Sequence, residues 1–377
     1  MSQEVQTRIF INDTIHSHRY QRGVTRCFNH ITDGIINKFG KDVVIYSPEF
    51  RDYGDAKYIR SLPRLNFRGS MRLGITKVLS GINDQLAEIS ANRESTSIMY
   101  SPYYGNLKFK GLQVFTVHDM IHELFPQHFD HKRHDVRSFI AEKKHCLERG
   151  DVLIAVSKKS AKDILSFYPY LDSTKITVAH LGVDEFFFQD SNLPLKVTGK
   201  PYFLYVGQRL QYKNFLRLLV AFGQSGLSKD FDLRVISPSK SSFNLNEAEV
   251  MAQYKLQGNV HLITSASEIE LRESYKNALA FVYPSEYEGF GLPVLEAMAS
   301  GTLVATSNTS SMPEIAGQLA FYFDPYSSDS IAECLNKITN LSNNQRNDYI
   351  LQGIAHARTF TWSRCQQQIV NTLSSLA

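Results

Sequence analysis

Two glutamates stand on either side of a short glycine-containing turn in the stretch SEYEGFGLPVLEAMASG, residues 285–301. Glu288 precedes the turn and Glu296 follows it. Carboxylates accept hydrogen bonds from neighbouring hydroxyl groups, and ribose and sugars offer such hydroxyls in pairs. The spacing therefore predicts that the two carboxylates hold different parts of one extended ligand. The alternative is that Glu288 is solvated and Glu296 only complements a helix dipole.

The residues between the glutamates predict the start of a helix. Pro293 suits the first helical turn and Gly301 suits the position just past a helix end, which predicts a helix over about 293–300. The first N–H groups of a helix lack partners within it and carry partial positive charge. Gly289 and Gly291 allow a ligand to approach this backbone closely. The stretch therefore predicts a site for an anion beside hydroxyl groups.

A second set of residues, YVGQRLQYKNF (205–215), offers positive charge. It follows an apolar run and precedes an amphipathic one, so Gly207 is expected in a strand-end turn. Arg209 and Lys213 are then expected in the crevice at the carboxyl end of the strand, where open α/β sheets bind ligands. Two such cations suit a diphosphate. The alternative is a solvated basic loop.

Two weaker signals lie in the first half. His118, in TVHDMIHELFP (116–126), follows another apolar run and is either a hydrogen-bond donor to a polar ligand or a structural histidine. Gly23 lies in the first expected strand–helix turn, without a G-x-G-x-x-G pattern. Asp230 and Asp232 form a D-x-D pattern, which we interpret as turn carboxylates rather than a metal site. No metal site is expected.

These residues need a scaffold of buried strands and helices. Apolar, β-rich runs without clean alternation are separated by mixed, amphipathic stretches, which indicates parallel sheets covered on both faces. The runs are 8–12, 42–47, 97–101, 113–119, 151–157, 176–182, 202–207, 232–237, 259–263, 279–284, 302–307 and 319–323. A polar stretch with Pro and Gly, residues 189–201, is typical of a linker. The sequence predicts α/β domains at 1–188 and 189–361, with a helix at 362–377 that packs back on the first.

Composition sets the broad class. The chain has 377 residues, 43% of them hydrophobic and 21% charged, with a net charge of +4, which is ordinary for a globular protein of about two domains. The four cysteines are widely scattered, so neither a zinc site nor a disulfide framework is expected. The N-terminal sequence lacks a basic start followed by an apolar stretch. We therefore expect a cytoplasmic protein without a nucleic-acid partner.

Together these motifs resemble the family 4 retaining glycosyltransferases of the GT-B fold, over nearly the whole chain. The most specific piece is SEYEGFGLPVLEAMASGTLVATSNTSSMPEIAG (285–317), supported by VGQRLQYKN (206–214), HDMIHELFP (118–126) and VLIAVSKKSAKDIL with ITVAHLGVD (within 152–184). Within the family the chain looks most like bacterial hexosyltransferases and mannosyltransferases of surface polysaccharide synthesis.

The resemblance implies retaining transfer from a nucleotide-sugar of the GDP-mannose or UDP-glucose type to a glycan or lipid-linked saccharide. The donor is a substrate, and neither a cofactor nor an essential metal is expected. The cleft would lie between two Rossmann-like domains whose parallel sheets face it. The implied contacts are Glu296 on ribose, and Glu288 and His118 on the sugar. Backbone amides of Phe290, Gly291 and Leu292 would face sugar and phosphate, Arg209, Lys213 and Gly23 would lie at the diphosphate, and Ile263 and Thr264 near the base. Gly207 and Gly289 are counted as substrate-binding because of the turns in which they lie.

Two alternative functions and the role of one basic segment stay open at this point. An epimerase on the same fold would convert the donor without an acceptor, and a silent protein would only bind it. The basic segment 57–77, which has no acidic residue and interleaved apolar ones, would contact anionic lipid at the inner face of a membrane, bind an anionic acceptor or stay solvated.

Overall fold

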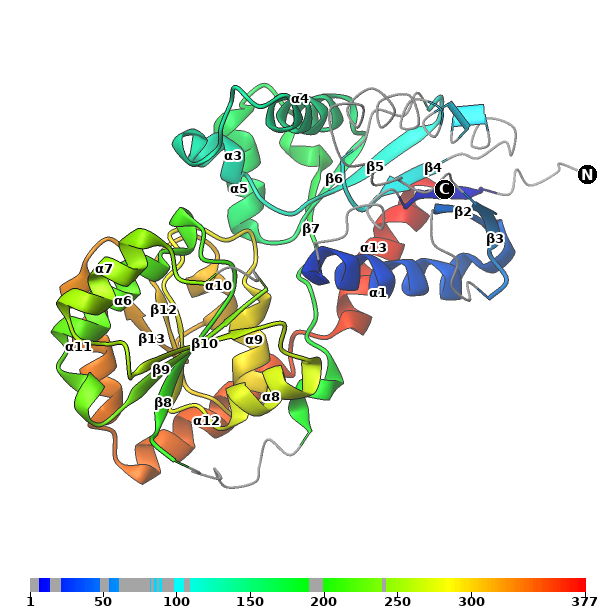
Figure 1. The fold of residues 1–377 in the computed structure, drawn as a ribbon. Helices are drawn as coiled ribbons and strands as arrows, with labels where there is room; N and C mark the ends of the chain where they lie inside the picture. The colour runs from blue at the N-terminus through cyan, green and yellow to red at the C-terminus, as the bar shows by residue number, and fades with distance from the viewer. Residues whose placement is uncertain are drawn as a thin grey trace, which may run out of the picture. The chain divides into compact units, whose positions relative to one another are not determined.

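The computed structural model describes residues 7–13, 22–47, 54–60, 82, 85–86, 88–89, 98–104, 109–189, 199–238 and 242–377. The chain divides into two compact units. The first contains Met1–Leu181 and Trp362–Ala377, and the second contains Gly182–Thr361. Each unit is a parallel α/β sheet with helices packed on it (Figure 1).

The first unit is built on a seven-stranded parallel sheet in the order β3-β2-β1-β4-β5-β6-β7. Its strands are β1 (Ile9–Asn12), β2 (Val43–Ser47), β3 (Lys57–Arg60), β4 (Ile98–Ser101), β5 (Leu112–Val117), β6 (Val152–Ala155) and β7 (Ile176–Val178). Its helices are α1 (Arg22–Phe39), α3 (Ile121–Leu124), α4 (His134–Arg149), α5 (Lys158–Phe167) and α13 (Trp362–Leu376), with 3-10 turns at Gly40–Asp42, Pro126–His128 and Ser173–Lys175.

The C-terminal helix α13 belongs to this first unit and packs along α1. The indole of Trp362 stacks on His30 of α1 with ring centroids 4.4 Å apart. Gln366 Nε2 donates a hydrogen bond to the carbonyl oxygen of His30 at 2.7 Å. The two ends of the chain are thereby joined in one unit.

The second unit has a six-stranded parallel sheet in the order β10-β9-β8-β11-β12-β13. Its strands are β8 (Tyr202–Val206), β9 (Asp232–Ser237), β10 (Val260–Thr264), β11 (Ala280–Tyr283), β12 (Val304–Ser307) and β13 (Ala320–Phe323). Its helices are α6 (Phe215–Gln224), α7 (Leu245–Gln253), α8 (Glu268–Lys276), α9 (Leu292–Ala299), α10 (Met312–Ala316), α11 (Ser328–Thr339) and α12 (Asn343–Ala357), with 3-10 turns at Glu185–Phe188, Gln211–Lys213 and Leu227–Lys229.

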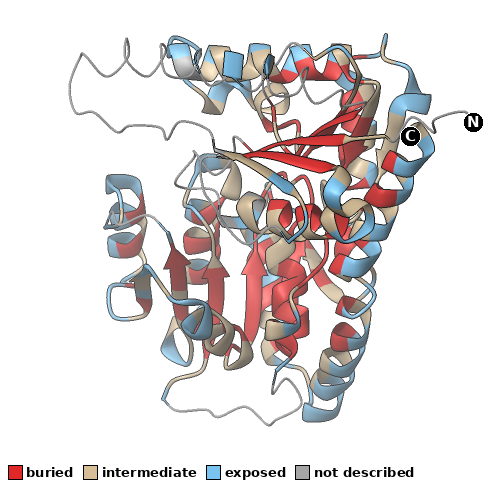
Figure 2. Cartoon of the chain, turned by 90° about the vertical axis from the view of Figure 1, so that its right-hand side faces the viewer, coloured by how far each residue is buried: buried red, intermediate tan, exposed pale blue. Residues whose placement is uncertain are grey.

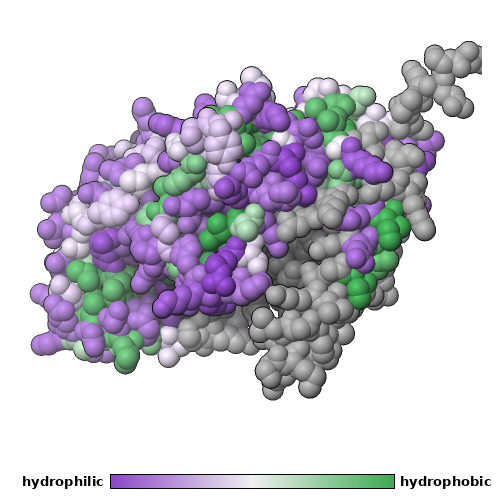
Figure 3. All heavy atoms as spheres, turned by 90° about the horizontal axis from the view of Figure 1, so that it is seen from above, coloured by the Kyte–Doolittle hydropathy of each residue, from purple (hydrophilic) through white to green (hydrophobic). Residues whose placement is uncertain are grey.

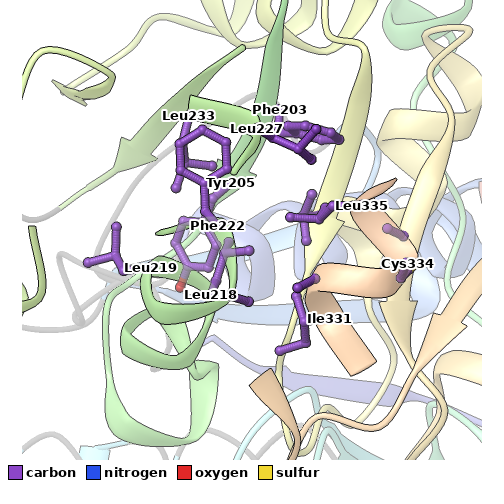
Figure 4. Close-up of a cluster of buried hydrophobic side chains, with 14 of the residues drawn as sticks. Phe203, Tyr205, Leu218, Leu219, Phe222, Leu227, Leu233, Ile331, Cys334 and Leu335 are labelled. Atoms are coloured by element: carbon purple, nitrogen blue, oxygen red, sulfur yellow. The ribbon is translucent and has the colours of Figure 1, made fainter. Parts of the chain in front are cut away.

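Helices cover both faces of this second sheet, which explains why its strands lack an alternating pattern. α6 packs on α7 and α11, while α9 packs on α8, α10 and α12. Side chains from β8, β9, α6 and α11 form one core, with Phe203, Leu218 and Leu335 fully buried (Figure 4). The central strands of both sheets are buried along most of their length, whereas the edge strands β3, β7 and β10 are mostly half-buried or exposed (Figure 2). The predicted fold of two doubly wound parallel α/β domains is confirmed.

The boundary between the units differs from the predicted one at 188/189. Residues from Gly182 onward belong to the second unit. The turn Glu185–Phe188 packs on α9, Phe187 lies edge-on to Tyr275 of α8, and the Val183 N–H donates to the carbonyl of Phe360 at 3.0 Å. A run of three phenylalanines buried against a helix is thus the start of the second unit. Of the expected linker, residues 190–198 lie outside the described residues.

The basic segment 57–77 was not expected to contain a strand, yet Lys57–Arg60 forms β3, paired with β2. Apolar Tyr58 and Ile59 extend the edge of the sheet there, and the periodic arginines had obscured this signal. Residues 61–77 lie outside the described residues. Within the described parts of the chain, no helix is both long and apolar enough to cross a bilayer. One face of the molecule is mostly hydrophilic, with hydrophobic residues in separate small patches (Figure 3).

Candidate active site

The chain order of the second sheet places two loops together. The strands run outward from β8 through β9 to β10, and then from β11 through β12 to β13 on its other side. β8 and β11 are therefore adjacent parallel strands whose following connections leave in opposite directions. Such a switch point opens a crevice at the carboxyl ends of the strands. The loops that follow, residues 207–214 and 284–291, are the two motifs that the sequence singled out.

Lys213 and Glu288 meet at this switch point. The Lys213 Nζ lies 2.6 Å from Glu288 Oε1, and the two side chains are 15% and 13% exposed. The ammonium also donates to the hydroxyl of Tyr283 at 3.2 Å. Burial raises the pKa of Tyr283 well above its ordinary value, and the charge of Glu288 raises it further. Tyr283 is therefore a neutral phenol beside a charged pair that solvent still reaches.

The loop that carries Glu288 is held by a row of hydroxyl side chains from the end of β12, a feature that sequence reasoning missed. The signal was the run TSNTSS, residues 306–311, whose residue types offer five hydroxyls in six positions. They donate to successive carbonyls as follows: Thr306 to Tyr283 (3.1 Å), Ser307 to Ser285, Thr309 to Glu286 (3.0 Å), Ser310 to Glu288 (2.6 Å), and Ser311 to Glu288 and Phe290 (both 2.8 Å).

The turn after Glu288 leads into α9 as the sequence predicted, one residue earlier than expected. Gly291 is the N-cap with φ +103°, a conformation that L side chains rarely adopt. Gly291 has no side chain that could cap the helix, and a helix leaves its first N–H groups without partners inside the helix. Gly289 and Phe290 are buried, the latter edge-on to Phe360, while Leu292 is half-buried.

Glu296 does not share partners with Glu288. It is 8% exposed on α9, and Tyr275 of α8 donates its hydroxyl to Glu296 Oε2 at 3.2 Å. A carboxylate buried one turn inside a helix needs such donors to stay ionised. The two glutamates thus occupy separate environments on one loop–helix element, and each keeps carboxylate oxygen capacity for other donors.

Arg209 and Lys213 pair with different carboxylates. The Arg209 Nε lies 3.0 Å from Glu247 Oε1, with side chains 6% and 3% exposed. Its Nη2 donates to the carbonyl of Ser242 at 2.7 Å, and the guanidinium lies over Phe243 at 5.3 Å. Glu247 also caps α7 through a capping box with Asn244. This partner could not be recognised from the sequence, because Glu247 looks like an ordinary residue of a first helical turn.

The remaining expected residues of this unit lie along the same edge. Gly207 follows β8, and its N–H donates to the carbonyl of Ile236 in β9 at 2.9 Å. Ile263 and Thr264 end β10, the outermost strand, half-buried and exposed respectively. The D-x-D residues lie at the opposite edge, where Asp232 contacts Lys200 at 3.4 Å and His261 at 3.1 Å. Asp232 is thus engaged by cationic and imidazole groups.

In the first unit, His118 directly follows the carboxyl end of β5. Its Nε2 is 2.9 Å from the carbonyl oxygen of Pro102, which follows β4. Since a carbonyl only accepts, Nε2 carries the proton, and a neutral ring then keeps Nδ1 as an acceptor. Burial lowers the pKa of His118 because it disfavours the charged imidazolium. Gly23, by contrast, is the second residue of α1 and is exposed; the turn before it lies outside the described residues.

A buried ion pair supports the turn that holds His118. Lys143 of α4 is fully buried, and its Nζ lies 2.7 Å from Glu123 Oε2 and 3.9 Å from Asp119 Oδ1. Asp119 in turn accepts the N–H of Ile121 at 3.1 Å, which begins α3. Glu123 lies within the motif 118–126, but its sequence context indicates no role for it, and nothing in the local pattern of α4 marks Lys143.

Comparisons with known proteins agree with this geometry. The family glycosyl transferases group 1 matches residues 187–355. The O-antigen chain mannosyltransferase B of Escherichia coli is 28% identical over 275 residues, which cover 70% of each protein.

Two solved structures resemble the whole chain. The sucrose-phosphate synthase of Thermosynechococcus elongatus superimposes with a TM-score of 0.76 at 18% identity, over 98% of this chain and 99% of that one. Anabaena HepE in complex with UDP and glucose superimposes with a TM-score of 0.70 at 16% identity, over 98% and 100%. Most of the second unit therefore matches glycosyl transferases group 1, and the chain is a glycosyltransferase with the GT-B fold.

Proposed function

We propose that this enzyme is a retaining hexosyltransferase of surface polysaccharide synthesis. It moves a hexose from a nucleotide-sugar of the GDP-mannose or UDP-glucose type to a glycan or lipid-linked saccharide. The name of its E. coli relative supports mannose and an O-antigen chain, and the UDP and glucose in HepE support a nucleotide-sugar donor. The observation that carries the proposal is the Lys213–Glu288 pair at the β8/β11 switch point, beside the start of α9.

The donor diphosphate is proposed to bind at Lys213 and at the N–H groups that begin α9. Phosphate oxygens compete with Glu288 for the ammonium, and the displaced carboxylate is then available to accept hydrogen bonds from sugar hydroxyls. Glu296 takes the ribose hydroxyls, and Tyr275 keeps that carboxylate oriented. Arg209 is the second cation of the proposal; because Glu247 and Ser242 hold it, it contributes through the field of its charge and the shape of its loop more than by reaching the ligand.

The chemical step breaks the bond between the anomeric carbon and the phosphate oxygen. The acceptor hydroxyl oxygen bonds to the anomeric carbon on the same face, and its proton passes to an oxygen of the leaving diphosphate. Negative charge grows on that diphosphate, so cations and helix N–H groups fixed in place stabilise the transition state more than the ground state. The proposal uses no covalent nucleophile, no cofactor and no essential metal, and activity is expected to survive EDTA.

The first experiment compares Lys213→Ala with Lys229→Ala in a transfer assay with GDP-mannose and UDP-glucose. Lys229 is the matched control, because it is exposed and precedes β9 at the amino edge of the same sheet. Loss of one charged donor at the site is expected to lower kcat by about 10²–10³-fold, and the control is expected to match wild type. Near-normal turnover by Lys213→Ala would refute the assigned role. The anomeric configuration of the product, read by NMR, decides between retention and inversion.

Peripheral membrane contact and a location at the inner face of the membrane stay predictions. Residues 57–60 of the basic segment form β3 at the edge of the first sheet, where Lys57 is exposed. Flotation with liposomes of neutral lipid and of anionic lipid tests the membrane contact. Binding that depends on anionic lipid supports membrane contact, and equal recovery with both compositions contradicts it.

A further inference from the structure

Asn214 follows Lys213 directly and has an unusual backbone conformation. Its φ of 59° and ψ of 27° are left-handed, a region that asparagine tolerates better than most L residues. It is also the N-cap of α6, yet its side chain makes no hydrogen bond to that helix. Asparagine is among the best capping residues, so its side-chain amide serves another purpose here.

The amide of Asn214 joins three strand-end loops. Its Nδ2 donates to the carbonyl of Pro284 at 3.0 Å and to that of Pro325 at 2.6 Å. These prolines follow β11 and β13, whereas Asn214 itself follows β8. Both amide N–H groups are thereby satisfied, and the residue is only 5% exposed. Because both partners are carbonyls, the orientation of the amide is fixed.

Arg217 completes the same network. Its Nη1 donates to Asn214 Oδ1 at 2.7 Å, to the Pro325 carbonyl at 2.8 Å and to Glu286 Oε1 at 3.2 Å. The N–H of Glu286 donates to the carbonyl of Tyr212 at 2.8 Å. These contacts lie one residue from Lys213 along one loop and two residues from Glu288 along the other. The network therefore sets how closely the two loops approach at the ion pair.

We propose that Asn214 is a positioning residue that holds the Lys213 ammonium where the donor diphosphate leaves. This inference rests on the proposed function. Stabilisation of the leaving group depends on a fixed cation, and a displacement of about 1 Å can cost on the order of 10²-fold in rate. Loss of the amide therefore lowers kcat more than it raises the KM for the donor, because the interaction strengthens in the transition state.

The test distinguishes the role of the Asn214 side-chain amide from the role of its left-handed backbone. Asn214→Gly keeps access to the left-handed conformation but removes the bridge to Pro284 and Pro325. Its kcat is expected to fall by about 10–100-fold with the donor KM changed less than about threefold. A kcat within about twofold of wild type would overturn the proposal, since the residue would then serve only the turn. Lys255→Gly is the control, because Lys255 is also left-handed (φ 55°) but exposed after α7.

A second variant and a structural measurement allow the positioning role of Asn214 to fail separately from the proposed function and from folding. Asn214→Asp is nearly isosteric but turns an oxygen toward two carbonyls, so it is expected to lose at least as much kcat as Asn214→Gly. A crystal structure of either variant is expected to show Lys213 Nζ beyond hydrogen-bond distance of Glu288. An unchanged pair would overturn the positioning role even if no transfer were found. Absence of transfer by wild type itself would instead sink the proposed function.

Discussion

Replacing Gly291 by alanine tests whether the turn before α9 is as constrained as the structure indicates. Gly291 has φ +103°, and a Cβ there would lie 2.5 Å from the Met312 Cε. The left-handed backbone costs an L residue about 1–2 kcal/mol. Met312 is fully buried, so its methyl has little room to move, and overpacking costs about 1–3 kcal/mol. We expect Gly291→Ala to destabilise the second unit by about 2–5 kcal/mol.

Two comparisons separate these contributions. Gly226 has φ +73° with no atom near the added Cβ, so Gly226→Ala is expected to cost only the backbone part, about 1–2 kcal/mol. In a Met312→Val background, which removes the clashing methyl, Gly291→Ala should cost about the same as Gly226→Ala.

Hydrogen exchange of peptides from the second unit measures these costs locally, which avoids assuming two-state unfolding of a two-unit chain. Transfer by Gly291→Ala should also fall by at least about tenfold, because the helix N–H groups are misplaced. Equal costs at Gly291 and Gly226, with normal transfer, would refute this reasoning.

Three further predictions concern residues around the site. Lys143→Met leaves Glu123 buried without its cation and should destabilise the first unit by about 3–5 kcal/mol, read by hydrogen exchange of its peptides, whereas Lys143→Met with Glu123→Leu should recover most of it; an unchanged single variant contradicts this. Tyr275→Phe removes the donor to Glu296 and should weaken nucleoside diphosphate binding in calorimetry by about tenfold, on the order of 1.5 kcal/mol; unaltered affinity contradicts it. The pKa of His118 in the folded protein, read by NMR, should lie below 6.5, and a value of 6.5 or higher contradicts this. Because the unfolded state then binds the proton more readily, the contribution of neutral His118 to folding stability is complete above pH 6.5. It is lost as the pH falls through the lowered pKa of the folded state.

Much of the fold could be predicted from the sequence, because parallel strands buried on both faces appear as continuous apolar runs. The run 232–237 coincides with β9, and the helix predicted over about 293–300 is α9 at Leu292–Ala299. β3 was missed because its four residues, KYIR, carry charges at both ends. The boundary at Gly182 was missed because burial of Phe187 against Tyr275 is a tertiary contact.

The loops that form the site could be predicted from the sequence, but the pairing of their side chains could not. The Lys213–Glu288 contact joins residues 75 positions apart, and it follows from the switch point only once the strand order is known. The Arg209–Glu247 pair could not be predicted, since either residue alone looks like a solvated charge. The hydroxyl run 306–311 was visible but ambiguous, because serine and threonine are common in any loop.

The central claim, that the chain transfers a hexose from a nucleotide-sugar to an acceptor, is tested most directly by product analysis of the purified enzyme. GDP-mannose and UDP-glucose are each incubated with and without a lipid-linked saccharide acceptor, and nucleoside diphosphate and glycan are quantified together. We predict diphosphate release that depends on the acceptor, in step with an elongated glycan whose new linkage keeps the anomeric configuration of the donor. Conversion of the donor sugar without any acceptor, or no release from either donor with acceptor present, would contradict the account.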